Sequence, residues 1–282
     1  MRCIFCKQNS SDSKSIEHII PESLGNTTLT LPKGVVCDKC NNYYARKIEA
    51  PILNSTELKA LRFKEAIPNK KGIIPPVSGI MNGVPVSLHR ISFDSHDLQQ
   101  FEVMVSFDPK DYNQVVNAES IITPAFTDDT DVKNSIILSR FIAKIALEAL
   151  AERVIKAEGW ESFIIDNSSF DPIRNYARRG GFIEWPCKIR RIYGIDQQFV
   201  RNGDNLVQII HECDFLLIPS DQDNIYESDE ISAFCYFIVA LWGLEFTINM
   251  AGPDEDGLQM YDKWLTEHDS VSPLYWRKKQ EN

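Results

Sequence analysis

The sequence predicts an α+β protein in which residues 1–60 form a small metal-stapled module ahead of a larger mixed α+β domain. Three observations predict this. Four of the seven cysteines form two Cys-x-x-Cys pairs within the first 40 residues, one long stretch after residue 130 has helical periodicity, and two late stretches are rich in aromatic and β-branched residues. The chain has 282 residues, 43% of them hydrophobic, which is enough for a core in each part.

The long central helix is expected over residues 131–158. Apolar side chains recur there every three or four positions, as on a helix that faces a core. Asp131 or Asn134 is placed to cap its start, and Gly159 is placed to end it. We expect this helix to lie at the centre of the second domain.

The other segments predict shorter helices and long late strands. The two late stretches have the composition of paired central strands, and a Pro-, Gly- and Lys-rich stretch is typical of a connector. The expected elements are a helix over 55–65, strands over 101–107, 205–220 and 234–250, and a final amphipathic helix over 258–268. The predicted parts are a module over 1–60, a connector over 61–90, and an α+β domain over 91–282 for substrate selection, dimerisation or regulation.

Charge is divided unevenly along the chain. Residues 1–90 carry 13 Lys and Arg against 7 Asp and Glu, whereas residues 91–282 carry 17 against 33. The formal net charge of −10 argues against unspecific coating of DNA. A basic front part on an acidic body suits a module whose task differs from that of the rest.

Location follows from what the sequence lacks. No apolar run reaches the roughly 18 residues that span a bilayer, and the first residues do not resemble a signal peptide. We therefore expect a cytoplasmic protein without a membrane partner. In such a protein cysteines are metal ligands or buried thiols before they are disulfides.

The paired cysteines predict a structural zinc site. Cys3 and Cys6 form one pair, Cys37 and Cys40 form the other, and four thiolates suit tetrahedral Zn²⁺. The alternative is four unrelated buried cysteines. Because zinc with four thiolate ligands has no open coordination position, it is a scaffold and activates nothing.

The residues with catalytic potential lie between the cysteine pairs and just after them. Glu17 and His18 precede a short apolar pair and a proline, and Asn41 directly follows the last cysteine. Carboxylate and amide oxygens are hard ligands that suit Mg²⁺ or Mn²⁺, and a neighbouring His can take a proton from water. The alternatives are a solvated Glu17, a structural His18, and an Asn41 that caps the following helix.

The strip Glu-His-Ile-Ile-Pro-x-Ser-Leu-Gly-Asn, followed by Cys-x-x-Cys-Asn-Asn, resembles the HNH endonuclease family in its variant with two zinc knuckles. The resemblance covers residues 1–50. It implies a ββα-metal fold, with a hairpin that carries the acidic/His pair and a helix that carries the last ligand. It further implies that His18 is the general base and that Glu17 and Asn41 hold a catalytic divalent ion.

Two positions depart from the family pattern. The middle Asn of the motif corresponds to Pro32, so His18 must be oriented by a backbone carbonyl or by another side chain, with Asn26 and Asn42 as candidates. A further ligand one turn after Asn41 would fall on Ala45, which cannot bind a metal. The remaining ligands would then be water and phosphate oxygens, which Mg²⁺ accepts.

Basic residues suggest where a phosphate backbone would lie. One group follows the second cysteine pair, and another stands out in the acidic second part. The candidate phosphate contacts are Arg46, Lys47, Arg174, Arg178, Arg179, Arg190 and Arg191. The alternative is that these side chains are solvated or pair with the protein's own acids.

Together these features predict an endonuclease that hydrolyses DNA with Mg²⁺ or Mn²⁺, in restriction or phage defence. The resemblance implies 5′-phosphate and 3′-hydroxyl products, and the sequence leaves open whether RNA is cut as well. One site per chain cuts one strand, so a double-strand break would need a homodimer or two sequential nicks. The competing prediction is a non-catalytic zinc module that binds nucleic acid or a protein.

Overall fold

The computed structural model has mixed α+β architecture, as the sequence predicts. It describes residues 1–64, 66–69, 71–91, 102–123, 135–181, 185–194, 199–200, 206–207, 211–219 and 233–280. Contacts divide the chain into unit 1, which comprises Met1–Ile20, Thr27–Glu49 and Val132–Asn282, and unit 2, which comprises Pro21–Asn26 and Ala50–Asp131. The boundaries expected at residues 60 and 90 concern function and stay a prediction. None of the described helices is long and apolar enough to cross a membrane.

The N-terminal segment of unit 1 is a hairpin followed by a helix. Strand β1 (Glu17–His18) pairs antiparallel with β2 (Thr30–Leu31), and α1 (Asp38–Tyr44) follows. The π-helical turn η2 (Ala45–Glu49) continues α1. A small core of fully buried apolar side chains, Phe5 and Tyr44 among the largest, holds these pieces together. This is the ββα arrangement that the resemblance implies.

Helix α5 (Ile136–Val154) is the central helix of unit 1. The Ser135 side chain caps it by accepting a hydrogen bond from the Leu138 amide, and the helix ends at Val154. It is therefore shorter than the expected 131–158, and the two caps expected at residues 131 and 134 lie outside the described residues. Buried, mostly apolar side chains of α5 point to nearly all sides of the helix, which is typical of a helix that other elements cover all around.

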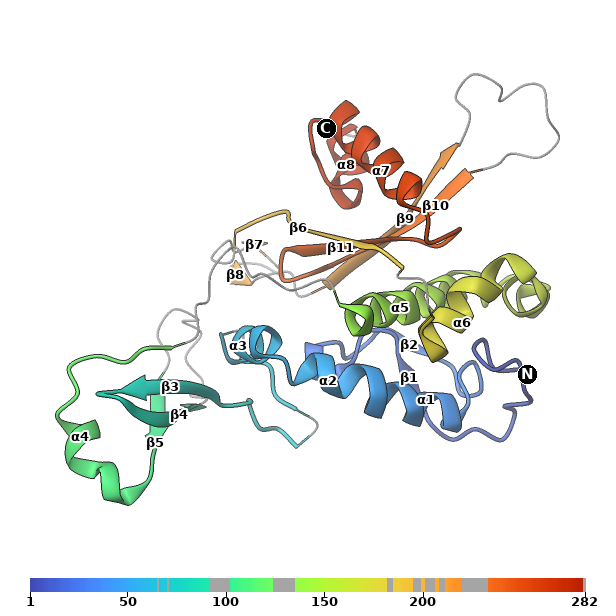
Figure 1. Cartoon of the computed structure of the whole chain (residues 1–282). Coiled ribbons are helices and arrows are strands. Elements are labelled where there is room, and N and C mark those ends of the chain that lie inside the picture. Colours follow the sequence, from blue (N-terminus) through green and yellow to red (C-terminus); the bar gives the residue numbers. More distant parts are fainter. Residues whose placement is uncertain are drawn as a thin grey trace. The chain divides into compact units, whose positions relative to one another are not determined.

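A four-stranded antiparallel sheet lies beside α5 (Figure 1). Its order is β6 (Cys187–Arg191), β11 (Leu244–Asn249), β10 (Ala233–Leu241) and β9 (His211–Pro219). The single strand expected over 234–250 is wrong, because Trp242 and Gly243 both have positive φ and turn the chain into the β10–β11 hairpin. A two-residue turn of this kind matches the twist of the strands that it joins.

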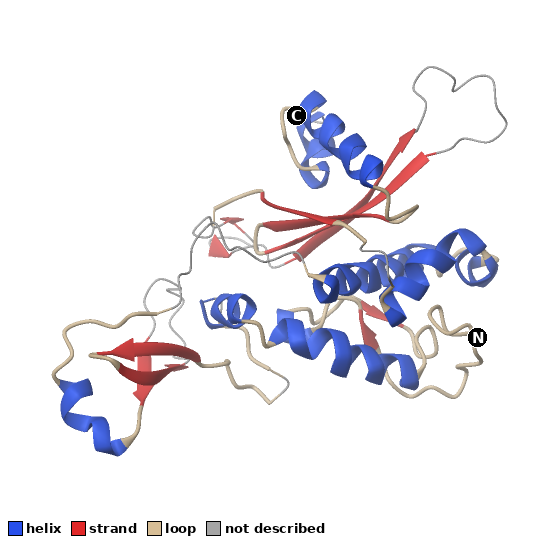
Figure 2. Ribbon diagram, viewed as in Figure 1, coloured by secondary structure: helices blue, strands red, loops and turns tan. Residues whose placement is uncertain are grey.

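Unit 1 is layered. Helix α5 lies between the sheet and the N-terminal segment, with contacts to β10, β11, β2 and η2, and α6 (Asp171–Arg179) packs alongside it (Figures 1 and 2). On the other face of the sheet lie α7 (Glu255–Glu267) and α8 (Pro273–Gln280). The expected final helix corresponds to α7, and the expectation missed α8. Tyr236 and Ile238 of β10 face α7 in a common apolar cluster, so both sides of the sheet are covered.

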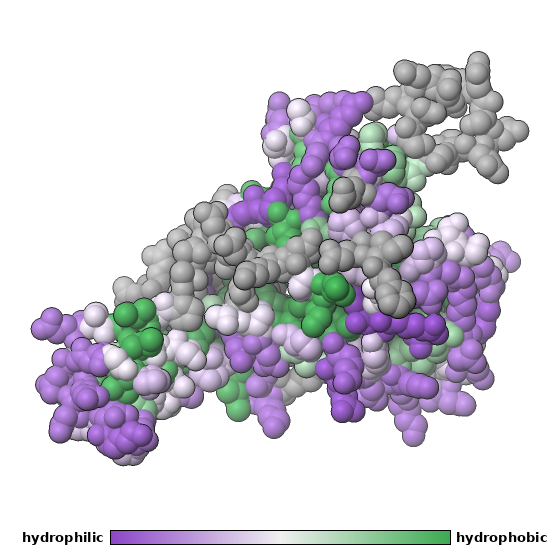
Figure 3. Space-filling model, in the orientation of Figure 1, coloured by the Kyte–Doolittle hydropathy of each residue, from purple (hydrophilic) through white to green (hydrophobic). Residues whose placement is uncertain are grey.

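Unit 2 has a small core of its own around an antiparallel sheet. Its elements are η1 (Glu22–Leu24), α2 (Ala50–Leu53), α3 (Thr56–Lys64), β3 (Val77–Met81), β4 (Val84–Ile91), β5 (Glu102–Ser106), η3 (Pro109–Asp111) and α4 (Tyr112–Val116). Residues 61–90, expected as a connector, contain β3 and most of β4. Large apolar side chains such as Ile80, Met104 and Ile122 remain exposed, and hydrophobic surface is visible in this part in Figure 3.

Short elements complete the described chain. In unit 1 they connect the longer helices and strands already given. They are η4 (Ser162–Asp166), η5 (Ser168–Phe170), β7 (Phe199–Val200) and β8 (Leu206–Val207). The two short strands pair with each other and not with the four-stranded sheet.

Candidate functional site

Four cysteines converge in unit 1 as the sequence predicts. The sulfur atoms of Cys3, Cys6, Cys37 and Cys40 all lie within 4.8 Å of one another, and the Cys6 and Cys37 sulfurs are 3.6 Å apart. The first pair lies in the N-terminal turn, whereas Cys37 is the N-cap of α1 and accepts a hydrogen bond from the Cys40 amide. The cluster fits the predicted structural zinc, because four sulfurs at this separation match its tetrahedral ligand set.

The thiols of the cluster differ in pKa. The hydrogen bond from Cys40 lowers the pKa of Cys3 to about 5, and the same hydrogen bond raises the pKa of Cys40. One thiolate therefore forms at the expense of its neighbour. A Zn²⁺ ion at this position would deprotonate the thiols that bind it.

The predicted acidic/His pair lies on strand β1. Glu17 is buried and pairs with Leu31, and His18 is half-buried and pairs with Thr30. The Nδ1 atom of His18 is buried and has no hydrogen-bond partner among the described residues. Pro32, which the resemblance aligns with the middle Asn of the motif, has no side-chain group that could hydrogen-bond to the imidazole.

One buried ammonium lies against the Glu17 carboxylate. Lys144 of α5 is fully buried, and its Nζ lies 2.7 Å from an oxygen of Glu17 and 2.7 Å from one of Glu49. The Glu148 carboxylate, one turn further along α5, lies 3.0 Å away. The ammonium also donates a hydrogen bond to the His18 backbone carbonyl at 3.4 Å. Lys144 therefore fixes both residues of the pair, Glu17 by its side chain and His18 by its backbone.

The electrostatics of this cluster keep the ammonium charged. Burial alone would lower the pKa of Lys144, but the carboxylates of Glu148, Glu17 and Glu49 raise it well above its usual value. Burial raises the pKa of Glu148 well above the usual range of a carboxyl group. Three carboxyl groups thus surround one ammonium, and burial works against the charged form of Glu148.

The three asparagines of the motif occupy different settings. Asn41 lies in the first turns of α1, half-buried, and its backbone amide donates to the Cys37 carbonyl. Asn42 is exposed on the same helix. Asn26 is fully buried and belongs to unit 2. The role of Asn41 as a metal ligand, and the orienting roles of Asn26 and Asn42, stay predictions.

Most of the basic residues in the second part are engaged within the protein. Arg174 is buried and donates to the Ile4 and Ile164 carbonyls and to Asp171. Arg190 pairs with Glu245, and Arg191 donates to backbone carbonyls. For these three arginines, internal pairing was the alternative that the sequence left open.

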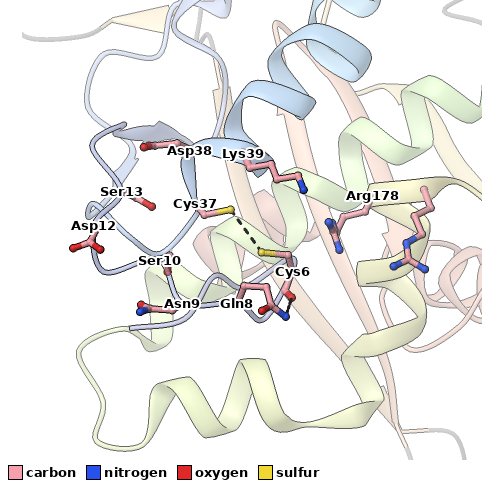
Figure 4. Close-up of a pocket in the computed structure, with 11 residues that line it drawn as sticks. Cys6, Gln8, Asn9, Ser10, Asp12, Ser13, Cys37, Asp38, Lys39 and Arg178 are labelled. Atoms are coloured by element: carbon pink, nitrogen blue, oxygen red, sulfur yellow. Dashed lines mark hydrogen bonds between the residues drawn. The ribbon is translucent and has the colours of Figure 1, made fainter.

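Other basic residues border a pocket beside the cysteine cluster. The pocket has a volume of about 570 Å³, and Lys39, Arg178 and Arg179 lie on its border together with Cys6 and Cys37. Figure 4 shows the Lys39 and Arg178 side chains extending toward each other next to the two cysteines. These three cations therefore lie on one border, together with Asp12 and Asp38, although Lys39 and Arg178 are 139 positions apart in the sequence.

Arg46 and Lys47 are exposed on η2, and each remains available to a partner in solution. Their π-helical turn directly continues α1, the helix that carries Asn41. Turns of this type often accompany functional sites. Both residues stay predicted phosphate contacts.

Sequence reasoning missed Lys144 and Glu148. A signal for them exists: Arg140, Lys144 and Glu148 follow one another at intervals of four inside the long, mostly apolar stretch of α5, so they share one face. Arg140 donates to the Tyr43 hydroxyl at 2.7 Å and to the Arg178 carbonyl. Charged side chains along one face of a largely buried helix predict that polar groups of another element pack against that face. The spacing alone does not reveal which groups these are.

Comparison with known proteins bears out the resemblance of the N-terminal segment. Residues 3–57 match the model of a family described as HNH endonuclease. The matched segment contains the four clustered cysteines together with Glu17, His18 and Asn41. A search of the curated proteins found no match to the chain, and neither did a search of the solved structures.

Proposed function

We propose that the chain is a metal-dependent endonuclease that hydrolyses phosphodiester bonds of DNA at His18. One observation carries the proposal: the segment that matches the HNH family places a Glu–His pair on a hairpin strand, followed by a helix that begins at a zinc-site cysteine. This arrangement brings a proton acceptor, an acidic residue and a rigid metal-stapled frame into 50 residues. A binding module would need only the frame.

His18 would act as the general base. A positioned general base contributes about 10²–10⁴-fold to a rate. The His18 backbone is fixed by β2 on one side and by Lys144 on the other. The ring would take a proton from the water that attacks phosphorus in line with the leaving 3′ oxygen.

Glu17 and Asn41 would hold the catalytic ion. Their oxygen atoms are the hard donors that Mg²⁺ and Mn²⁺ prefer, so the residues present fit such an ion in chemistry. When bound, the ion supplies charge stabilisation to the phosphate and to the leaving oxygen. Glu17 also forms an ion pair with the buried Lys144, so its carboxylate would have both a structural partner and the metal ion as a ligand partner.

The substrate backbone would lie along the cations that border the pocket. Lys39, Arg178 and Arg179 line the pocket, and Arg46 and Lys47 are exposed on η2, which continues the helix α1 that carries Lys39. Contacts of this kind fix register without reading sequence. The proposal therefore includes no preferred sequence.

Nicking of supercoiled plasmid in Mg²⁺ or Mn²⁺ tests the proposal. Wild type should convert it to open circle, His18→Ala should not, and the matched control His89→Ala, in unit 2, should behave like wild type. Equal nicking by His18→Ala and wild type would overturn the assignment. Binding of DNA without nicking in either metal would instead establish the non-catalytic zinc module. Single-stranded and duplex RNA in the same assay would settle the choice of polymer.

A further inference from the structure

Lys144 has more carboxylate partners than a single ammonium needs. One ammonium, fully buried, is approached by carboxylates from three separate elements: Glu17 from β1, Glu49 from η2 and Glu148 from α5 itself. A single counter-charge would satisfy a lysine. The arrangement gives Lys144 two partners that remain in place if Glu17 is withdrawn.

The ammonium also lies where it interferes with a metal ion on Glu17. A Mg²⁺ ion binds a carboxylate oxygen at about 2.1 Å, and Lys144 Nζ is 2.7 Å from Glu17 Oε1. An ion on the same oxygen would therefore lie within about 5 Å of the ammonium. Like charges at that distance repel strongly in a medium of low dielectric constant.

We propose that Lys144 and the catalytic divalent ion compete for the Glu17 carboxylate, so that the structure shows the closed form of the nuclease site. In this form α5 holds Glu17 through the ammonium. Opening the site requires the ammonium to shift toward Glu49 and Glu148, which releases Glu17 to the ion. The inference rests on the proposed function, because it takes Glu17 as a ligand of the nuclease metal.

The surplus of carboxylates makes such a shift feasible. A buried ammonium that loses its only partner would be left unpaired, which is strongly unfavourable. When Glu17 leaves, Lys144 keeps its ion pairs with Glu49 and Glu148, so the shift does not leave the ammonium without a counter-charge. The reciprocal consequence is that metal binding at Glu17 loosens one tie between β1 and α5.

Substitutions at position 144 test the competition through metal affinity. Lys144→Gln keeps much of the side-chain length and its hydrogen-bond donors but removes the charge, so it should bind Mn²⁺ at least about tenfold more tightly than wild type in an electron paramagnetic resonance titration. Lys144→Arg keeps the charge and should remain near wild type. Adding Glu17→Gln to Lys144→Gln should abolish the gain, which would place the gained affinity at Glu17.

A matched control separates competition from loosening of the helix. Arg140 lies one turn before Lys144 on α5 and also ties the helix to the N-terminal segment, through the Tyr43 hydroxyl, without contacting Glu17. Arg140→Gln should leave the Mn²⁺ affinity unchanged. An equal gain in Arg140→Gln, or no gain in Lys144→Gln, would overturn the proposal.

The double variant Lys144→Met/Glu148→Gln guards against misfolding of Lys144→Gln. It removes the ammonium together with the buried carboxyl of Glu148, and leaves Glu17 and Glu49 in place. It should show the same gain, and its melting temperature should rise with added Mn²⁺ more than that of wild type. A double variant that folds and binds Mn²⁺ no more tightly than wild type would also refute competition.

Plasmid nicking by the same variants distinguishes the two failures. If Mn²⁺ affinity rises as expected but none of the proteins nicks DNA, the proposed function fails and the competition stands. If wild type nicks DNA and the affinity of Lys144→Gln is unchanged, the competition fails and the proposed function stands.

Discussion

Arg174 offers a sharp test of how the segment with the four-cysteine cluster is held to the rest of unit 1. Its guanidinium is buried and donates to the Ile4 carbonyl at 2.7 Å, to the Ile164 carbonyl, and to Asp171. Ile4 lies between the first two cysteines, so this side chain supports the backbone of the zinc knuckle directly. Arg174→Met keeps the apolar length of the side chain and removes every donor.

The expected loss follows from the two buried carbonyls. A hydrogen bond from a charged donor contributes about 1.5–3 kcal/mol, and a buried group left unpaired costs about 1–3 kcal/mol. The pair with Asp171 is partly exposed and adds less than about 1 kcal/mol. We therefore expect Arg174→Met to lower the free energy of unfolding by about 3–4 kcal/mol, a large effect for one substitution.

Urea denaturation followed by circular dichroism measures this loss. Arg179→Met is the matched control, because Arg179 lies on the same helix but is exposed, and its unfolding free energy should stay within about 0.5 kcal/mol of wild type. A second readout is zinc retention during dialysis against a chelator, which should be weaker in Arg174→Met alone. If both variants have the same free energy of unfolding as wild type, the buried guanidinium does not support the backbone around Ile4.

Three further predictions concern other parts of the structure. Lys39→Gln should weaken DNA binding at every sequence and reduce the slope of log K against log salt by about 0.9 if it contacts one phosphate; an unchanged slope would remove it from the interface. Burial raises the pKa of Cys187 to about 12, so at pH 8 only about one molecule in 10⁴ carries the thiolate. Alkylation of Cys187, measured by mass spectrometry, should therefore become about tenfold faster per pH unit, and labelling at pH 8 as fast as that of a free cysteine would contradict this. Gly243→Ala should destabilise the β10–β11 hairpin far more than Gly83→Ala, since both have positive φ but only at Gly243 would a Cβ meet the Tyr193 ring and carbonyl within 3 Å; equal melting temperatures would show that the turn can adjust.

The features that sequence predicted well are those encoded by local spacing. The cysteine pairs specify a cluster because each Cys-x-x-Cys turn brings its own two thiols together. The fold then has only to bring the two turns next to each other. The β1–β2 hairpin and α1 follow from the family resemblance of a short strip. The position of α5 follows from its apolar periodicity, although the cap proved to be Ser135.

The features that sequence did not predict depend on partners distant in the chain. The β10–β11 turn could not be predicted because Trp242 is large and aromatic, a residue type that favours strands and rarely has a positive φ. Lys144 and Glu17 are 127 positions apart, and no periodicity connects them. The basic residues were ambiguous for the same reason: whether Arg174 faces solvent or the Ile4 carbonyl depends on how α6 packs.

The energetics of buried ion clusters bear on why α5 carries charge at all. Burying charged groups is costly, and replacing such a cluster by well-packed apolar side chains is often neutral or stabilising. Lys144 and Glu148 are fully buried among mostly apolar side chains of α5, so stability alone does not account for them. The cluster touches Glu17 and the His18 backbone, the two adjacent residues on which the proposed chemistry depends. Its position thus favours control of that pair, by a helix that also forms the core of unit 1, over a contribution to stability.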